Sequence, residues 1–60
     1  MNKFELIINN KINGNLSDFE EQVKKLTKLD LLNLIEYWTG HYGTERHTII
    51  NDLRLVFEHV

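Results

Sequence analysis

The sequence contains no cysteine, no proline and no alanine, and it has only three glycines. Without cysteine the chain forms neither a disulfide nor a thiolate zinc site, and it has no thiol nucleophile. A domain of 60 residues is near the lower size limit for folding alone, because it buries only about 60% of the surface of its unfolded chain. Chains this small usually gain stability from disulfides, a metal or a partner chain. We therefore expect one domain, residues 1–60, that forms a homodimer.

Charge of one sign is not in excess either: seven Lys+Arg face nine Asp+Glu, and the formal net charge is −2. Proteins that bind the phosphates of nucleic acids usually carry a basic excess, which this chain lacks. No apolar run approaches the length that spans a membrane, and the N-terminus has no apolar signal-peptide core with a cleavage site. The sequence predicts a cytoplasmic protein with no membrane partner.

The scarce residue types have GC-rich codons, whereas the abundant asparagine, isoleucine and lysine have AT-rich codons. The gene is therefore expected to be AT-rich, as in low-GC bacteria and many of their phages and plasmids. A short reading frame that begins at Met1 is typical of an accessory gene of a phage or mobile element.

Residues 29–38 are strongly apolar, and their spacing predicts a central helix. At about 100° per residue, four large side chains share one face of that helix: Leu31, Leu34, Ile35 and Trp38. Leu32 widens this face and Leu29 lies nearly opposite it, so apolar side chains cover most of the circumference. A helix at the edge of a domain has a narrower apolar stripe. We expect the rest of the chain, or a second copy, to enclose this helix.

Residues 2–13 place apolar side chains at helical spacing: Phe4, Ile7, Ile8 and Ile12. A strand competes with this helix, because Phe4, Leu6 and Ile8 alternate and Asn13-Gly14 is a hairpin signal. No matching strand follows, however, and Gly14 suits the left-handed residue that ends a helix. We predict a helix here and keep the strand as the alternative.

Two capping signals divide the next part of the chain. Residues 17–20 match a capping box. In this motif the Ser17 hydroxyl accepts a hydrogen bond from the Glu20 amide, and the Glu20 carboxylate accepts one from the Ser17 amide. This box predicts a surface helix that packs by a narrow seam: Phe19, Val23 and Leu26. Thr27, with Asp30 three residues later, predicts a second helix start. The alternative is one continuous helix with a kink at Thr27.

Glycine and threonine predict where the central helix ends and the last helix begins. We expect Gly40 to end the central helix, residues 39–44 to form a loop, and Thr44 to cap a last helix over residues 45–59. That helix has an apolar arc of about 120°: Ile49, Ile50, Leu53, Val56, Phe57 and Val60. Leu55 lies outside the arc.

These elements predict an all-α fold, a small three- to four-helix bundle that homodimerisation completes. The apolar side chains that lie off the predicted core face define the expected dimer interface: Leu29, Leu32 and Leu55.

No pattern in the sequence predicts catalysis or a cofactor. Ser17, the only serine, is explained by its capping box, and no Gly-x-Ser-x-Gly nucleophile elbow is present. The carboxylates considered for acid–base chemistry are explained as helix caps or solvated residues: Asp30, Glu36 and Asp52. A domain of this size also has little room for a substrate pocket. We predict that the chain is not an enzyme.

The three histidines raise the question of a metal site. Helical metal sites usually place their ligands at i,i+3 or i,i+4 on one face. His41 precedes the last helix, and His47 and His59 lie on different faces of it. We predict three hydrogen-bonding side chains and no bound metal.

Aromatic and basic side chains gather where the central helix meets the glycine loop. Tyr, Trp and Arg are enriched in the hot spots of protein interfaces. Trp38 is expected in the core, whereas Tyr37 and Tyr42 are expected to be exposed. The predicted protein-binding site has five residues: Tyr37, His41, Tyr42, Arg46 and His47. We expect a helical dimer that presents this site to a host protein and inhibits or redirects it by steric binding.

DNA binding is the alternative function. Two helices joined by a glycine-containing turn resemble a helix-turn-helix in outline, and residues 44–48 with Asn51 include side chains that read base edges. Against this, the expected turn exceeds the usual three to four residues, and the net charge is acidic. The supporting lysines lie on the surface helix: Lys24, Lys25 and Lys28. A purely structural subunit of a larger assembly is a third interpretation.

Overall fold

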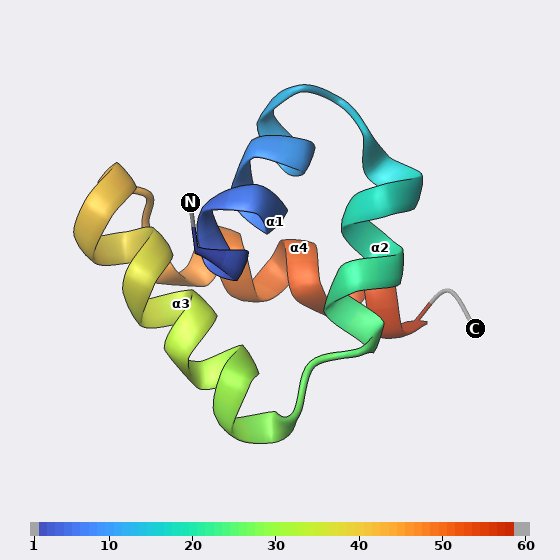
Figure 1. Cartoon of the computed structure of the whole chain (residues 1–60). Helices are drawn as coiled ribbons and strands as arrows, with labels where there is room; N and C mark the ends of the chain where they lie inside the picture. Colours follow the sequence, from blue (N-terminus) through green and yellow to red (C-terminus); the bar gives the residue numbers. More distant parts are fainter. Residues whose placement is uncertain (1, 59–60) are drawn as a thin grey trace.

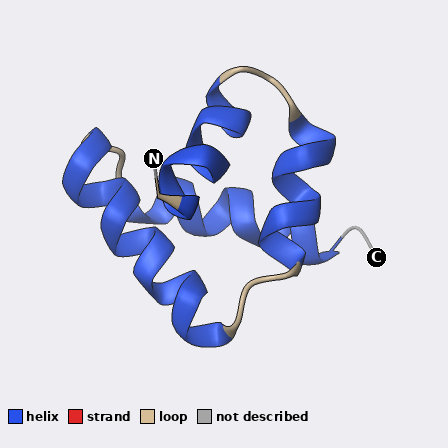
Figure 2. Cartoon of the chain, viewed as in Figure 1, coloured by secondary structure: helices blue, strands red, loops and turns tan. Residues whose placement is uncertain are grey.

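The structure of the chain, a computed structural model, describes residues 2–58. The secondary structure of this range is entirely helical (Figures 1 and 2). In chain order the helices are α1 (Lys3–Ile12), α2 (Leu16–Lys24), α3 (Lys28–Tyr42) and α4 (Arg46–Glu58). The predicted all-α fold is confirmed, and the strand alternative for residues 2–13 is wrong. His59 and Val60, which the sequence pattern assigns to the last helix, lie outside the described residues.

The ends of α1 explain why its residues form a helix. The Asn2 side chain accepts a hydrogen bond of 2.9 Å from the Glu5 amide and caps the first turn. At the other end Gly14 has a φ of 81°, which a glycine adopts without a steric cost. The Gly14 amide bonds to the Lys11 carbonyl, and the Asn15 amide bonds to the Asn10 carbonyl at 2.9 Å. These two bonds form a Schellman motif, so the predicted role of Gly14 is confirmed.

The capping box predicted for α2 is wrong. The helix begins at Leu16, with Asn15 as its N-cap residue, and Ser17 therefore lies inside the first turn. The Asn15 carbonyl already accepts a 3.0 Å bond from the Phe19 amide. Because the motif at Gly14 turns the chain within two residues, α2 starts before Ser17 can take the capping position.

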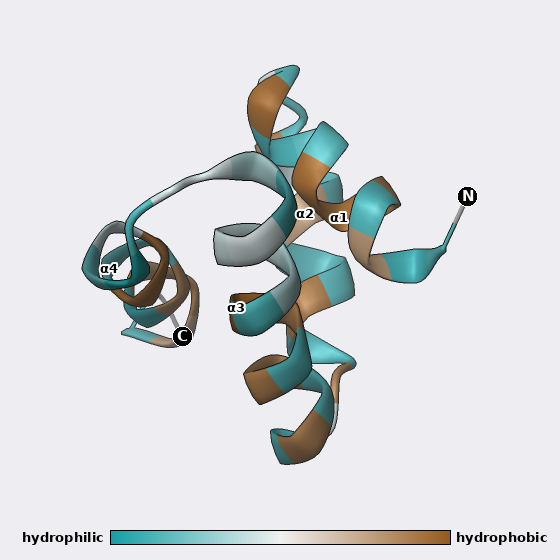
Figure 3. Cartoon of the chain, turned by 90° about the vertical axis from the view of Figure 1, so that its left-hand side faces the viewer, coloured by the Kyte–Doolittle hydropathy of each residue, from teal (hydrophilic) through white to brown (hydrophobic). Residues whose placement is uncertain are grey.

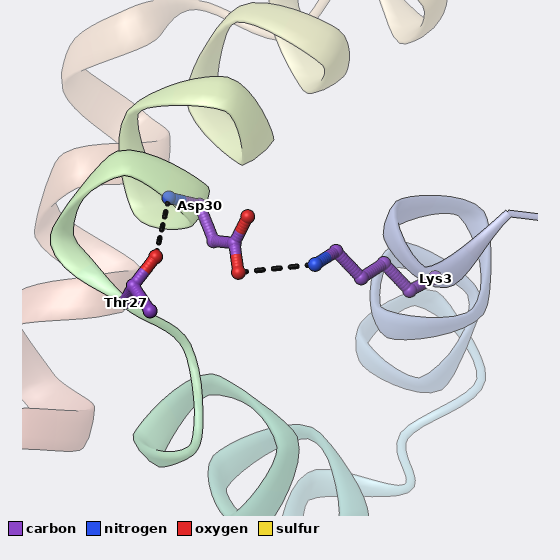
Figure 4. A network of polar contacts seen from close by, with 3 residues as sticks. All are labelled: Lys3, Thr27 and Asp30. Atoms are coloured by element: carbon purple, nitrogen blue, oxygen red, sulfur yellow. Dashed lines mark hydrogen bonds and ion pairs between the residues drawn. The ribbon is translucent and has the colours of Figure 1, made fainter.

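The break between α2 and α3 lies where Thr27 predicts it. The last turn of α2 tightens, because the amides of Lys25 and Leu26 bond to carbonyls three residues back. The Thr27 hydroxyl then accepts a 3.1 Å bond from the Asp30 amide and caps α3. The Asp30 carboxylate in turn receives a 3.0 Å bond from Lys3 of α1 (Figure 4). Thr27 is confirmed as a helix start, and the continuous helix is wrong.

The predicted end of the central helix at Gly40 is wrong, because α3 continues for two more residues. Gly43, with a φ of 68°, ends the helix, and its amide bonds to the Thr39 carbonyl at 3.2 Å. The Glu45 carbonyl accepts the first bonds of α4, so Glu45, rather than Thr44, directly precedes that helix. The turn between α3 and α4 is therefore only residues 43–45.

The hydrophobic core draws on all four helices and contains these buried side chains: Ile7, Ile8, Phe19, Val23, Leu34, Ile35, Trp38, Ile49, Leu53 and Val56. Trp38 contacts the ring of Phe19 edge-on, with ring centroids 6.2 Å apart. Leu31, which shares the predicted apolar face of α3, is partly buried and packs against this core. Figures 1 and 3 show α4 crossing α3 instead of running antiparallel beside it.

Candidate binding surfaces

Three of the five predicted protein-binding residues form one aromatic cluster at the end of α3. The rings of Tyr37 and His41, one helical turn apart, stack with centroids 4.0 Å apart and an interplanar angle of 14°. The ring centroid of Tyr42 lies 6.5 Å from that of Tyr37, and the two rings are tilted relative to each other. We call Tyr37, His41 and Tyr42 the aromatic corner.

Contacts with α1 hold Tyr37 in place. Its hydroxyl donates a 2.6 Å hydrogen bond to the Glu5 carboxylate, and its ring lies 5.9 Å from that of Phe4. The hydrogen bond to Glu5, together with desolvation, raises the pKa of Tyr37 above its usual value of 10.0. Tyr37 is half-buried, so its expected exposure is wrong: the hydroxyl reaches α1, which sequence spacing does not reveal. Tyr42 is exposed, as expected.

The orientation of His41 follows from its backbone contact. Its Nδ1 lies 3.2 Å from the Tyr37 carbonyl oxygen. A carbonyl oxygen only accepts hydrogen bonds, so Nδ1 carries the hydrogen in this contact. His41 is exposed, and its Nε2 remains able to bond to a group outside the chain.

Arg46 and His47 lie across the turn, in the first part of α4, and both are exposed. His47 Nε2 lies 3.3 Å from a Glu45 carboxylate oxygen. Within residues 2–58, Arg46 makes no ion pair, and neither residue shares a hydrogen bond or ring contact with the aromatic corner. The structure thus joins three of the five predicted residues and leaves Arg46 and His47 nearby in the chain but separate in contacts.

The three residues of the predicted dimer interface do not form one patch. All three are exposed. Leu29 and Leu32 lie on the first half of α3, where Figure 3 shows hydrophobic and hydrophilic residues interleaved. Leu55, on α4, instead borders a small hollow beside Leu16 of α2. Any interface that uses the α3 leucines therefore faces differently from one that uses Leu55.

Sequence reasoning missed an apolar groove between α3 and α4. Its volume is about 360 Å³, and seven residues line it: Leu31, Ile35, Ile50, Leu53, Arg54, Phe57 and Glu58. Ile50 and Phe57, which belong to the predicted apolar arc of the last helix, are 37% and 43% exposed. They lie on one edge of the α4 arc, beside Leu31 and Ile35 of α3, whereas Val56 on the other edge lies beside residues of α1 and α2. The sequence did contain a signal for this groove. The apolar arc predicted for the last helix is wide, and a chain of 60 residues has no further helix to cover it.

Asp30, one of the carboxylates considered for catalysis, instead forms an ion pair with Lys3. Its hydrogen bond and ion pair with Lys3 lower the pKa of Asp30 below its usual value of 3.8. Within residues 2–58, no three His, Asp or Glu side chains are arranged to hold a metal ion.

No helix in the described part of the chain is both long enough and apolar enough to cross a membrane.

Comparison of the chain with known protein families, curated proteins and solved structures found no match. Its function is therefore inferred from its own residues.

Proposed function

We propose that this chain is a non-enzymatic, cytoplasmic protein-binding domain that works as a homodimer and blocks a surface of another protein. The residue composition, which favours an AT-rich gene, supports an accessory role in a phage or mobile element, with a host protein as the target. The aromatic corner is the observation that carries this proposal.

The aromatic corner has the properties of an interface hot spot. Tyrosine buries a large area with few rotatable bonds, so it loses little entropy on binding. Stacking with His41 and the bond to Glu5 fix Tyr37 before any partner arrives, which reduces the ordering cost further. Tyr42 and Arg46, which follow Tyr37 along the chain, are exposed and offer the two side-chain types most typical of hot spots after tryptophan.

The double substitution Tyr42→Ala with Arg46→Ala tests this proposal. Both side chains are exposed, so circular dichroism should show an unchanged fold. A matched control is Leu16→Ala with Lys24→Ala, which removes one large and one basic exposed side chain from α2. Each form is immobilised and exposed to a lysate of the source cell, and the captured proteins are quantified by mass spectrometry.

We expect at least one protein to be captured by the wild type and the control and to fall at least about tenfold with the double variant, because a hot-spot truncation costs about 2 kcal/mol. Equal capture by all three forms would remove the aromatic corner as the binding site. Absence of any specific capture would contradict the proposed function itself.

One observation favours DNA binding as the second candidate. The turn between α3 and α4 has only three residues, 43–45, and contains a glycine, as in a helix-turn-helix. The crossing of α4 over α3 (Figure 1) also resembles that motif. The objection that the turn is too long is therefore removed.

The charge distribution favours protein binding over DNA binding. Glu45 stands directly before α4, and Arg54 is paired with Glu58 at 3.2 Å. The lysines at the end of α2 and the start of α3 lie at the opposite end of α3 from the turn. Few phosphate contacts are thus available to an α4 placed in a groove of DNA.

Titration of labelled duplex DNA of random sequence, at low and moderate salt, separates the two functions. We expect no binding at either salt level. Binding at low salt that weakens steeply as salt is added is typical of counterion release and would place DNA binding first.

A further inference from the structure

The Glu5 carboxylate, which lies against the aromatic corner, has no positively charged partner. It is half-buried and accepts a 2.6 Å hydrogen bond from the neutral Tyr37 hydroxyl. Within residues 2–58 it forms no ion pair, because Lys3, the basic residue nearest to it in the sequence, pairs with Asp30 at 3.0 Å. Burial removes part of the hydration of a charge, so a partly buried carboxylate favours a cation beside it. Glu5 can therefore pair with a cation from outside the chain.

His41 supplies a second hydrogen-bond acceptor. Its Nδ1 hydrogen is used in the contact with the Tyr37 carbonyl oxygen, so the neutral ring has an acceptor at Nε2. The His41 ring lies on the face of the Tyr37 ring, with centroids 4.0 Å apart. The two acceptors are thus held against the same tyrosine: Glu5 bonds to its hydroxyl, and His41 stacks on its ring.

Two positioned acceptors beside aromatic rings suit the side chain of arginine. We propose that the aromatic corner and Glu5 together receive an arginine side chain of the target protein. A guanidinium has five N–H donors in a planar fork and no acceptor, so one group can bond to both Glu5 and His41. Its plane also stacks on aromatic rings, and the exposed Tyr42 ring offers such a face. This inference rests on the proposed function, since it names the group of the target that the aromatic corner recognises.

Other side chains fit this site less well. A carboxylate of a partner would be repelled by Glu5 and would find no donor at the neutral His41 Nε2. The ammonium of lysine is a compact charge without the planar fork of arginine. The net charge of −2 also attracts a basic partner at long range. Arg46 does not occupy the site from within, because in the described part of the chain it contacts none of the three rings.

A small molecule with the arginine side chain tests this proposal directly. The probe is N-acetyl-arginine amide, and the control is N-acetyl-citrulline amide, which has nearly the same shape without the charge. Side-chain NMR signals of the whole chain are followed during titration at constant ionic strength. A molecule of this size binds with a Kd of about 1 mM at best, so the titration extends to about 50 mM.

We expect the arginine probe to shift the signals of Tyr37, His41 and Tyr42 in a saturable manner. The citrulline control should bind at least about fivefold more weakly, because charge-assisted hydrogen bonds and the attraction of a cation to aromatic rings are lost. Equal shifts from the two molecules, or no shift from arginine, would overturn the proposal.

Two variants test the separate acceptors, and a third is a matched control. Glu5→Gln removes the charge but keeps an oxygen for the Tyr37 hydroxyl. His41→Phe keeps a ring that can stack on Tyr37 but removes Nε2. Glu21→Gln changes the net charge equally by removing an exposed carboxylate from α2.

The affinity for the arginine probe should fall at least about fivefold in Glu5→Gln and in His41→Phe and stay unchanged in Glu21→Gln. Equal affinity in the wild type and Glu5→Gln would overturn the pairing with Glu5, and equal affinity in His41→Phe would overturn the bond to Nε2. If a variant fails to fold, which its amide spectrum shows, the comparison of arginine with citrulline on the wild type decides.

This inference and the proposed function fail in different ways. If Tyr42→Ala with Arg46→Ala loses a captured protein, while arginine and citrulline shift the aromatic corner equally, the target is recognised through another group and only this inference is wrong. If arginine binds as expected but the wild type captures no protein from the lysate, the site accepts arginine and the proposed function is wrong.

Discussion

The Thr27 hydroxyl accepts a hydrogen bond from the Asp30 amide and so satisfies one of the free donors at the start of α3. We expect Thr27→Ala to lower the free energy of unfolding by about 1 kcal/mol, which lowers Tm by about 4–8 °C in a domain of this size. Ser17→Ala is the matched control and should leave Tm nearly unchanged, because Ser17 lies within α2. Equal losses for both would contradict the assignment of Asn15 as the N-cap residue of α2.

The contact between Lys3 and Asp30 predicts how stability depends on pH. Because folding lowers the pKa of Asp30 below 3.8, the ionised carboxylate favours the folded state. This stabilisation is present above pH 3.8 and is lost as the pH falls through the lowered pKa. We expect Tm of the wild type to exceed that of Asp30→Asn at neutral pH, and the difference to shrink in acid.

A control separates the lysine contact from the general effect of a carboxylate at a helix start. Asp18 occupies the first turn of α2 and, within residues 2–58, makes no ion pair. If Asp18→Asn reproduces the whole pH-dependent difference seen with Asp30→Asn, the contact between Lys3 and Asp30 contributes nothing of its own.

At the scale of the helix, the two glycines near the end of α3 predict opposite effects of alanine. Gly40 lies inside the helix, and a methyl group there meets no atom within 4 Å. We expect Gly40→Ala to raise the free energy of unfolding by about 1 kcal/mol through helix propensity. Gly43 has a φ of 68°, so Gly43→Ala should lower it by about 1–2 kcal/mol. Thermal unfolding of both variants checks this, and changes of the same sign would contradict the end of α3 at Gly43.

Helix types and several boundaries were predictable because they depend on local patterns. Apolar spacing predicts the helices, and Gly14 and Thr27 act within a few residues of their own positions. The errors at Ser17, Gly40 and Thr44 have another cause. Each residue is a competent cap, but the hydrogen bonds of a neighbouring turn or the continuing helix occupy the capping position first.

The aromatic corner was predictable only in part. Tyr37, His41 and Tyr42 lie on one helix, so their proximity follows from helical spacing. The bond from Tyr37 to Glu5 joins residues far apart in the sequence, and no local pattern reveals it. The positions of Arg46 and His47 depend on the turn at residues 43–45, whose length was predicted incorrectly.

At the scale of the whole molecule, the crossing of α4 over α3 determines which apolar side chains stay exposed. The sequence shows that the chain has more apolar surface than four short helices can cover. It does not show where the excess lies, because that depends on the angle between two helices. The structure leaves large apolar side chains exposed on all four helices, and Ile50 and Phe57 are the exposed ones that line the groove between α3 and α4.

The molar mass of the wild-type chain tests the central claim most directly. Light scattering behind a sizing column is measured at low and high protein concentration and at low and moderate salt. An interface built on apolar side chains should give twice 7.2 kDa at high concentration, and salt should change this little, because screening acts on charges. A mass of one chain under all four conditions would contradict the account.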